Sequence, residues 1–174
     1  MNFTKEMENH LKSMGWFPSR KITTYDEFME KYNYPEFVRK FIREFGGLKI
    51  LEFLEKKDSN VINRISLNPL DSDGMGPDSV AEDWSNDIGR KLYVVGLYSP
   101  ENFDIAVDAN GAVYFLGEDC YCLGKNIYQG LESIIRIDQW SSIQLDAQDS
   151  TSGIWYASKG QIDFDTYEFK YRTF

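Results

Sequence analysis

The sequence contains one histidine, His10, and no Gly-x-Ser-x-Gly stretch. Serine and cysteine nucleophiles are usually activated by a histidine base, so any such site would depend on His10. An enzyme acting on a small molecule or a carbohydrate could instead use two acids that converge in a deep pocket, but the sequence singles out no pair. We therefore expect no catalytic residues and interpret the chain as a protein without enzymatic activity.

Cysteine is almost as scarce, because Cys120 and Cys122 are the only two. Their spacing is too short for the disulfide frameworks of small secreted domains. Within a strand, a Cys-x-Cys pair points both thiols to one face, and even with His10 a tetrahedral zinc site would lack a fourth ligand. We expect two reduced thiols in a strand, no metal and no cofactor.

Long apolar runs are absent, and no segment reaches the roughly 20 apolar residues that a membrane span needs. Residues 1–14 also lack the positively charged start and apolar stretch of a secretory signal. These absences favour a cytoplasmic protein. Apolar residues make up 42% of the sequence and aromatic residues 16%, enough for the packed core of a single domain of this length.

Positive charge is scarce beyond residue 65. The net charge is +2 over residues 1–65 and −11 over residues 66–174, which gives −9 for the chain. A field of this sign repels nucleic acids and anionic membranes, so we expect neither as a partner. It favours a cationic partner, although an acidic surface also keeps a protein soluble without one.

Helical periodicity dominates the first third of the chain. Apolar residues recur at helical spacing over 3–14, until Gly15 ends the pattern. Thr24 followed by Glu27 predicts a capping box that begins a second helix. A third helix is predicted over 36–45, where Gly46 and Gly47 supply a left-handed end. Its expected apolar face consists of Phe37, Val38, Phe41, Ile42 and Phe45.

Beyond residue 47 the pattern changes to short segments rich in branched and aromatic residues, which are typical of strands. The predicted strands cover 48–53, 61–67, 91–98, 103–108 and 112–116. Asn110-Gly111 predicts a hairpin with a type I′ turn. One helix with Val80, Trp84 and Ile88 on one face is expected between the second and third strands. A last helix is marked by Ile127, Leu131, Ile134 and Ile135.

This order predicts an α+β fold with a largely antiparallel sheet of about five to six strands and helices packed against one face. We assign residues 1–140 to the main domain. Residues 141–174 are expected to form an extension packed on the same domain, because apolar residues alternate from Ile162 to Tyr171 in the manner of a hairpin.

The densest acidic stretch covers residues 71–87 and contains no lysine or arginine. Its acids are Asp71, Asp73, Asp78, Glu82, Asp83 and Asp87. Ser79 and Glu82 predict a capping box, and acids in the first turn of a helix suit its dipole. Capping leaves part of this charge unexplained. We interpret the surplus as a surface for a cationic partner, and a solvated acidic loop remains the alternative.

The same stretch has some of the spacing of a calcium loop. Counted from Asp71, residues Asp71, Asp73, Gly76, Ser79 and Glu82 fall at positions one, three, six, nine and twelve. Position five is Met75, whose side chain offers no oxygen, and a predicted strand precedes the loop where a calcium site has a helix. We therefore expect no metal here.

Three stretches together resemble one family. They are LKSMGWFPSR at residues 11–20, FIREFGGLKI at 41–50, and a third that runs from VG at 95–96 through DANGAVY at 108–114 to LG at 123–124. Their order and spacing resemble the SUKH superfamily, specifically its third subgroup, over about residues 8–137, which is within the usual size of one domain. A proline expected near Val95 is absent, and the aromatic tail lies outside the matching region.

The resemblance implies a Smi/Knr-like α+β fold and the role of an immunity protein in a bacterial polymorphic toxin system. Such proteins reside in the cytoplasm and bind the C-terminal toxin domain of a sister or rival cell, often a nuclease. Eukaryotic relatives are regulatory and scaffold proteins, so a non-enzymatic regulatory or scaffold domain remains the alternative function.

We accordingly predict that the chain neutralises a cognate toxin domain by occluding its active face. The expected contact residues are Asp71, Asp73, Asp78, Glu82, Asp83, Asp87, Trp140 and Trp155. Exposed aromatic residues surrounded by acids are typical of the centre of such an interface. The sequence leaves the oligomeric state and the identity of the toxin open.

Overall fold

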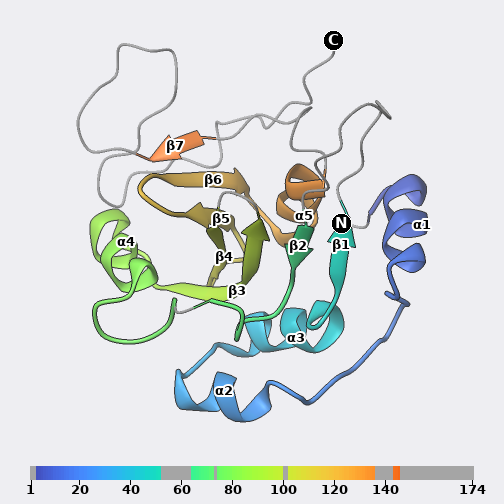
Figure 1. The fold of residues 1–174 in the computed structure, drawn as a ribbon, viewed down its shortest axis with the longest axis horizontal. Helices are drawn as coiled ribbons and strands as arrows, with labels where there is room; N and C mark the ends of the chain where they lie inside the picture. The colour runs from blue at the N-terminus through green and yellow to red at the C-terminus, as the bar shows by residue number, and fades with distance from the viewer. Residues whose placement is uncertain (1–2, 52–63, 73, 100–101, 136–142, 146–174) are drawn as a thin grey trace.

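A computed structural model describes residues 3–51, 64–72, 74–99, 102–135 and 143–145 (Figure 1). Within these residues the chain forms five helices and seven strands. The helices are α1 (Lys5–Ser13), α2 (Asp26–Lys31), α3 (Glu36–Phe45), α4 (Val80–Ile88) and α5 (Ile127–Ile135). The strands are β1 (Lys49–Leu51), β2 (Arg64–Ser66), β3 (Leu92–Ser99), β4 (Phe103–Asp108), β5 (Val113–Leu116), β6 (Cys120–Gly124) and β7 (Ile143–Leu145).

The seven strands form one antiparallel sheet in chain order, so each strand pairs with the next. The predicted α+β class and antiparallel sheet are confirmed. The seventh strand comes from the stretch assigned to the C-terminal extension, and it pairs with β6 through Cys122 and Ile143. The hairpin expected over 162–171 lies outside the described residues.

The helix predictions hold best where a cap and an apolar face agree. Helix α1 begins after Thr4, whose side chain accepts a hydrogen bond from the Met7 amide at 3.2 Å. Helix α3 has the predicted bounds. The capping box predicted at Thr24 is wrong, because the residue that precedes α2 is Tyr25, which makes no side-chain cap. Burial of Tyr25 in the core fixes this helix start.

The hairpin predicted at residues 110–111 is confirmed, but its turn is not type I′. Of the residues in this loop only Gly111 has a positive φ, of 93°. The Asp108 amide donates to the Ala112 carbonyl oxygen at 3.0 Å, and the Gly111 amide donates to the Asp108 carbonyl oxygen at 3.1 Å. The loop therefore has three residues, with glycine at the position that requires the left-handed conformation.

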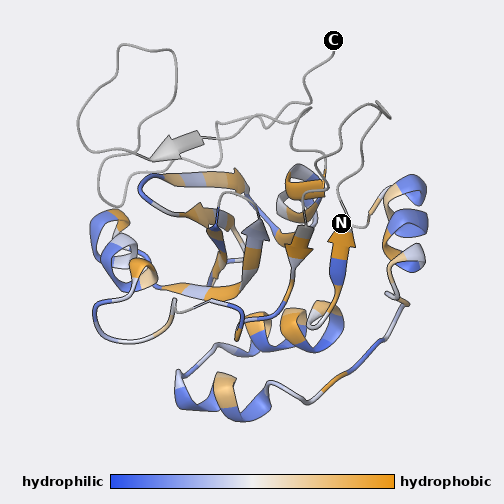
Figure 2. Ribbon diagram, in the orientation of Figure 1, coloured by the Kyte–Doolittle hydropathy of each residue, from blue (hydrophilic) through white to orange (hydrophobic). Residues whose placement is uncertain are grey.

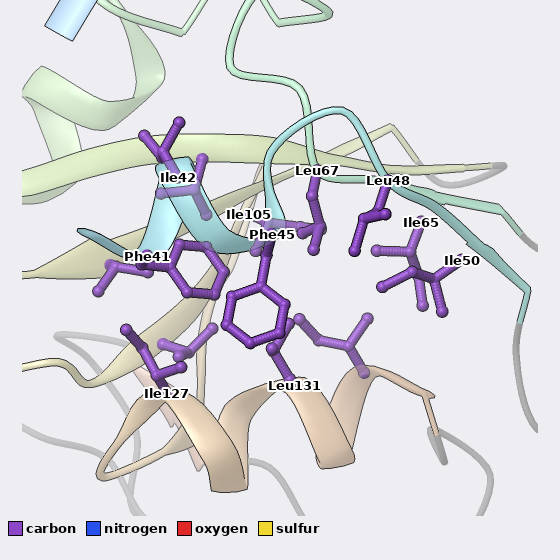
Figure 3. Packing of buried hydrophobic residues seen from close by; sticks show 14 of the residues in the cluster. Phe41, Ile42, Phe45, Leu48, Ile50, Ile65, Leu67, Ile105, Ile127 and Leu131 are labelled. Carbon is purple, nitrogen blue, oxygen red and sulfur yellow. The ribbon is translucent and has the colours of Figure 1, made fainter. Parts of the chain in front are cut away.

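The main core lies between one face of the sheet and helices α1, α2, α3 and α5. Figure 3 shows Phe41 and Phe45 of α3 facing Ile127 and Leu131 of α5, with strand residues such as Ile105 beside them. Phe37 does not belong to this buried face as predicted, since it is 45% exposed. Its ring lies against Gly111, where an added Cβ would be 2.8 Å from the ring.

A second, smaller core covers the opposite face of the sheet. Ala81 and Ile88 of α4 pack there on strand residues that include Tyr114. Cys120 and Cys122 both point to this face and are buried free thiols, as the Cys-x-Cys spacing predicts. The expectation that helices cover one face therefore holds for four helices and not for α4. Figure 2 shows hydrophilic residues over much of α4, at the side of the sheet.

Candidate functional site

The acids predicted for a partner surface fall within residues 68–91, which we call the α4 segment: the loop after β2, helix α4 and the turn into β3. Ser79 precedes α4, and its hydroxyl accepts a hydrogen bond from the Glu82 amide at 3.2 Å. Gly89 ends the helix with a φ of 68°. One half of the predicted capping box is therefore present. The other half is absent, because the Glu82 side chain turns to Lys91.

Three carboxylates of this segment, those of Asp78, Asp83 and Asp87, are exposed to solvent. None of the three makes a hydrogen bond or an ion pair through its side chain with the residues that the structure describes. Their negative charges are therefore uncompensated by neighbours, and they project an attractive field toward a cationic partner.

Two other predicted acids are engaged within the chain. Asp71 accepts hydrogen bonds from the Ser66 hydroxyl and, at 2.6 Å, from the Asn68 side-chain amide. Glu82 forms an exposed ion pair with Lys91, a type of pair that stabilises a protein little. The sequence window 71–87 contains no cation, but the fold brings in Lys91 from the turn before β3. Asp73, Trp140 and Trp155 lie outside the described residues.

Two of the calcium positions are engaged by other groups of the chain. The Asp71 carboxylate accepts a hydrogen bond from the Asn68 side chain, and the Glu82 carboxylate is paired with Lys91. In the part of the chain that the structure describes, no group of three or more His, Cys, Asp or Glu is placed to hold a metal ion.

Helix α4 packs on the sheet through Ile88 and Trp84 as its sequence predicts, but not through Val80. Ala81, Ser85 and Ile88 are the buried residues, whereas Val80 is 41% exposed. Trp84 is half-buried, and its indole N–H donates to the Gly117 carbonyl oxygen at 3.0 Å, which ties the helix to the β5–β6 turn. Val80 and Leu70, which is 56% exposed, place apolar side chains within the acidic segment. Apolar contacts within a polar rim are typical of protein interfaces.

The turn from α4 into β3 is anchored by a buried carboxylate. The Asp108 side chain is almost fully buried, and its Oδ2 forms an ion pair with Arg90 at 3.1 Å. Tyr114 donates its hydroxyl to the same oxygen at 3.1 Å, and Oδ1 accepts from the Asn110 and Ala112 amides. Burial is the largest cause that raises the pKa of Tyr114, so the phenol stays a donor. This network fixes the end of α4 on the β4–β5 hairpin.

A pocket of about 450 Å³ opens between the α4 segment and the end of α2. Its walls combine apolar and charged side chains from three parts of the chain. The lining residues are Tyr32, Met75, Gly76, Pro77, Asp78, Glu82 and Lys91. Sequence reasoning singled out Asp78 and Glu82 but missed Tyr32 and gave Met75 no role, because only the fold brings α2 beside this loop.

The pocket lies beside the first half of β3, which pairs with β4 on one side and with no described strand on the other. Strand β2 pairs with β3 only from Leu97 to Ser99. Side chains bind the backbone groups before that point: the Val94 amide donates to Met75 Sδ at 3.5 Å, and the Val94 carbonyl oxygen accepts from the Tyr34 hydroxyl at 2.5 Å. The Leu92 amide donates to Ser85 Oγ at 2.9 Å. These contacts hold the pocket walls against the sheet.

The sequence matches the SUKH-3 immunity protein family over residues 3–137. Neither the curated proteins nor the solved structures contain a significant match to it. Among the described residues, no helix has both the length and the apolar character that crossing a membrane requires. The match covers most of the chain, all three stretches that suggested the family, and the α4 segment. The chain therefore belongs to the SUKH-3 immunity protein family.

Proposed function

We propose that this chain acts in the cytoplasm as an immunity protein, which binds a cognate bacterial toxin domain through the α4 segment and covers its active face. The observation that carries the proposal is the set of three exposed, uncompensated carboxylates on α4 and its loop, in a member of an immunity protein family. The proposed action is binding alone, without catalysis, metal or cofactor.

The charge of the α4 segment favours a toxin with a cationic surface. A nuclease has such a surface, because it must hold the phosphates of its substrate. An acidic protein that approaches it is steered into contact at a high rate, and once bound it excludes the nucleic acid from the same surface. We therefore propose a nuclease as the toxin class, with direct binding of nucleic acid or membrane by this chain disfavoured.

The apolar residues of the segment would supply the contact area that charge alone does not. Leu70 and Val80 are two of the four large hydrophobic residues that are exposed in the described part of the chain. A stable interface buries about 800 Å² on each partner, and its affinity depends mainly on apolar anchors at the centre. Carboxylates around such anchors contribute chiefly to the association rate.

The test is co-expression with the C-terminal domain of the secreted protein encoded beside this gene. Growth rescue, together with co-purification of the two proteins in equal amounts, is the expected result. If the toxin domain stays lethal and the proteins elute separately, the proposed function is wrong. Binding of a host protein instead, with no rescue from any adjacent toxin domain, would favour a regulatory or scaffold role.

A further inference from the structure

The pocket beside α4 combines an aromatic wall with a net negative charge. Tyr32, Met75 and Pro77 provide apolar surface, while Asp78, Glu82 and Lys91 provide charge. Lys91 is paired with Glu82, so the three charged lining residues sum to −1, and Asp78 is the one that has no ion pair among the described residues. A ligand that matches this pocket carries one positive charge at the end of an apolar stem.

Tyr32 already attracts a cation within the chain. The ammonium group of Lys31 lies 4.8 Å from the centroid of its ring, within the range of a cation–π contact. The ring is held by Phe28, whose centroid lies 4.9 Å away, and Phe28 contacts Tyr34 in turn. Tyr32 therefore packs on core side chains and presents its ring at the pocket wall.

The other wall is also fixed before any ligand binds. Met75 is bound to the Val94 amide. The neighbouring Gly74 packs so closely on β4 that an added Cβ would lie 2.4 Å from a carboxylate oxygen of Asp104. Asp78 directly precedes the Ser79 cap of α4. Since these contacts are made without a ligand, binding would require little rearrangement of this wall.

We propose that this pocket receives an arginine side chain of the partner protein. The guanidinium group would bind the Asp78 carboxylate and take the place of the Lys31 ammonium at the ring of Tyr32, while its methylene stem would lie along Met75 and Pro77. Arginine fits better than lysine, because a planar guanidinium both pairs with a carboxylate through two N–H groups and stacks on an aromatic face. The inference rests on the proposed function and names the partner chemistry at the same surface.

The test uses N-acetyl-arginine methylamide as the probe and follows amide shifts of the ¹⁵N-labelled protein by NMR. We expect saturable shifts at Gly76 and Asp78, with a dissociation constant in the millimolar range, about the affinity of a single side chain. N-acetyl-citrulline methylamide has the same shape without the charge and should cause no saturable shift. Equal responses to the two probes, or arginine shifts scattered over the acidic surface, would overturn the inference.

Variants distinguish binding in the pocket from a general attraction of the probe to the acidic surface. Asp78→Asn should weaken binding of the arginine probe at least fivefold, and asparagine tolerates the left-handed backbone of this position, where φ is 65°. Asp87→Asn removes a similarly exposed charge outside the pocket and should change binding less than twofold. Tyr32→Leu should weaken binding of the arginine probe, whereas Tyr32→Phe should bind the probe as the wild type does. Equal effects of Asp78→Asn and Asp87→Asn would contradict a specific site.

The probe titration requires no toxin, so its failure is distinct from failure of the proposed function. A protein that rescues growth but does not bind the arginine probe would retain the proposed function and lose this inference. If the protein binds the probe at the pocket but rescues no growth, the arginine pocket stands and the proposed function is wrong.

Discussion

The hydroxyl of Tyr34 donates a 2.5 Å hydrogen bond to the carbonyl oxygen of Val94, 60 residues further along the chain. This bond joins the α2–α3 connection to the part of β3 that β2 leaves unpaired. Burial is the main cause that raises the pKa of Tyr34, so the phenol remains protonated and keeps donating at any physiological pH. The bond therefore helps to hold the aromatic wall of the pocket on the sheet.

Replacing Tyr34 with phenylalanine should test this link. The substitution keeps the ring but leaves the Val94 carbonyl oxygen without its donor, which costs about 1–3 kcal/mol in free energy of unfolding. Urea unfolding followed by fluorescence measures the loss. Tyr32→Phe is the control, since the hydroxyl of this half-buried residue makes no hydrogen bond with the residues that the structure describes. Equal stability of the two variants would show that the Tyr34 bond contributes nothing.

Asp108→Asn should destabilise the protein more strongly. An asparagine oxygen can still accept from the Asn110 and Ala112 amides, but its NH₂ group would face the donors of Arg90 and Tyr114. We expect a loss of about 3 kcal/mol in the free energy of unfolding, measured by urea denaturation, because buried donors lose their acceptor.

The control for Asp108 is Tyr114→Phe, which removes one of the four donors and should cost about 1 kcal/mol. If Asp108→Asn unfolds at the same urea concentration as the wild type, the network is not what anchors the end of α4.

Elements whose ends are fixed by residues close in sequence could be predicted, and elements fixed by contacts in the folded chain could not. Helix α3 had the predicted bounds, because its apolar face and the glycines that follow it lie within one short stretch. The start of α2 was wrong, because Thr24 offers a cap that the buried Tyr25 overrides. The turn at Asn110 was of another type, because the Asp108 carboxylate binds the loop amides and fixes a three-residue loop.

Of the candidate site, the sequence predicted only the position of the acidic residues. Composition locates negative charge at 71–87, but it does not show that Lys91 compensates Glu82 or that Asn68 binds Asp71. These partners depend on how the loop folds back on β2 and β3. Tyr32 lies more than 40 residues from Met75 in sequence and meets it only in the folded chain. A pocket formed by such distant residues leaves no local pattern.

Cys120 and Cys122 should be unreactive in the native protein. Burial is the largest cause that raises the pKa of both thiols, so both stay protonated. Ellman's reagent should therefore react with neither thiol in the folded state and with both in urea. Rapid reaction of the native protein at neutral pH would contradict their burial.

The same pKa shifts predict how stability depends on pH. A raised folded-state pKa means that the unfolded chain loses thiol protons first, from about pH 8.5 upward. Stability from these groups is therefore complete below that pH and falls as the pH rises further. The loss in free energy of unfolding between pH 7.5 and 9.5 should be smaller in a Cys120→Ala, Cys122→Ala variant. Parallel pH profiles for wild type and variant would assign the loss to other groups.

Reversing the uncompensated charge of α4 should slow binding to the toxin. The change is Asp83→Lys with Asp87→Lys, since neither side chain has a partner among the described residues. The association rate at low salt should fall about tenfold or more, and its dependence on salt should flatten, because both depend on the attraction between opposite charges. Stopped-flow fluorescence at several salt concentrations measures both.

The matched control is Glu27→Lys with Glu30→Lys, which reverses two exposed acids on α2 and changes the net charge by the same amount. If only overall charge matters, both variants slow association equally. If the α4 segment is the contact surface, the α4 variant slows it far more, because attraction between charges is screened beyond about 10 Å at moderate salt. If the two variants associate with the toxin at comparable rates, the toxin-binding surface does not lie on α4.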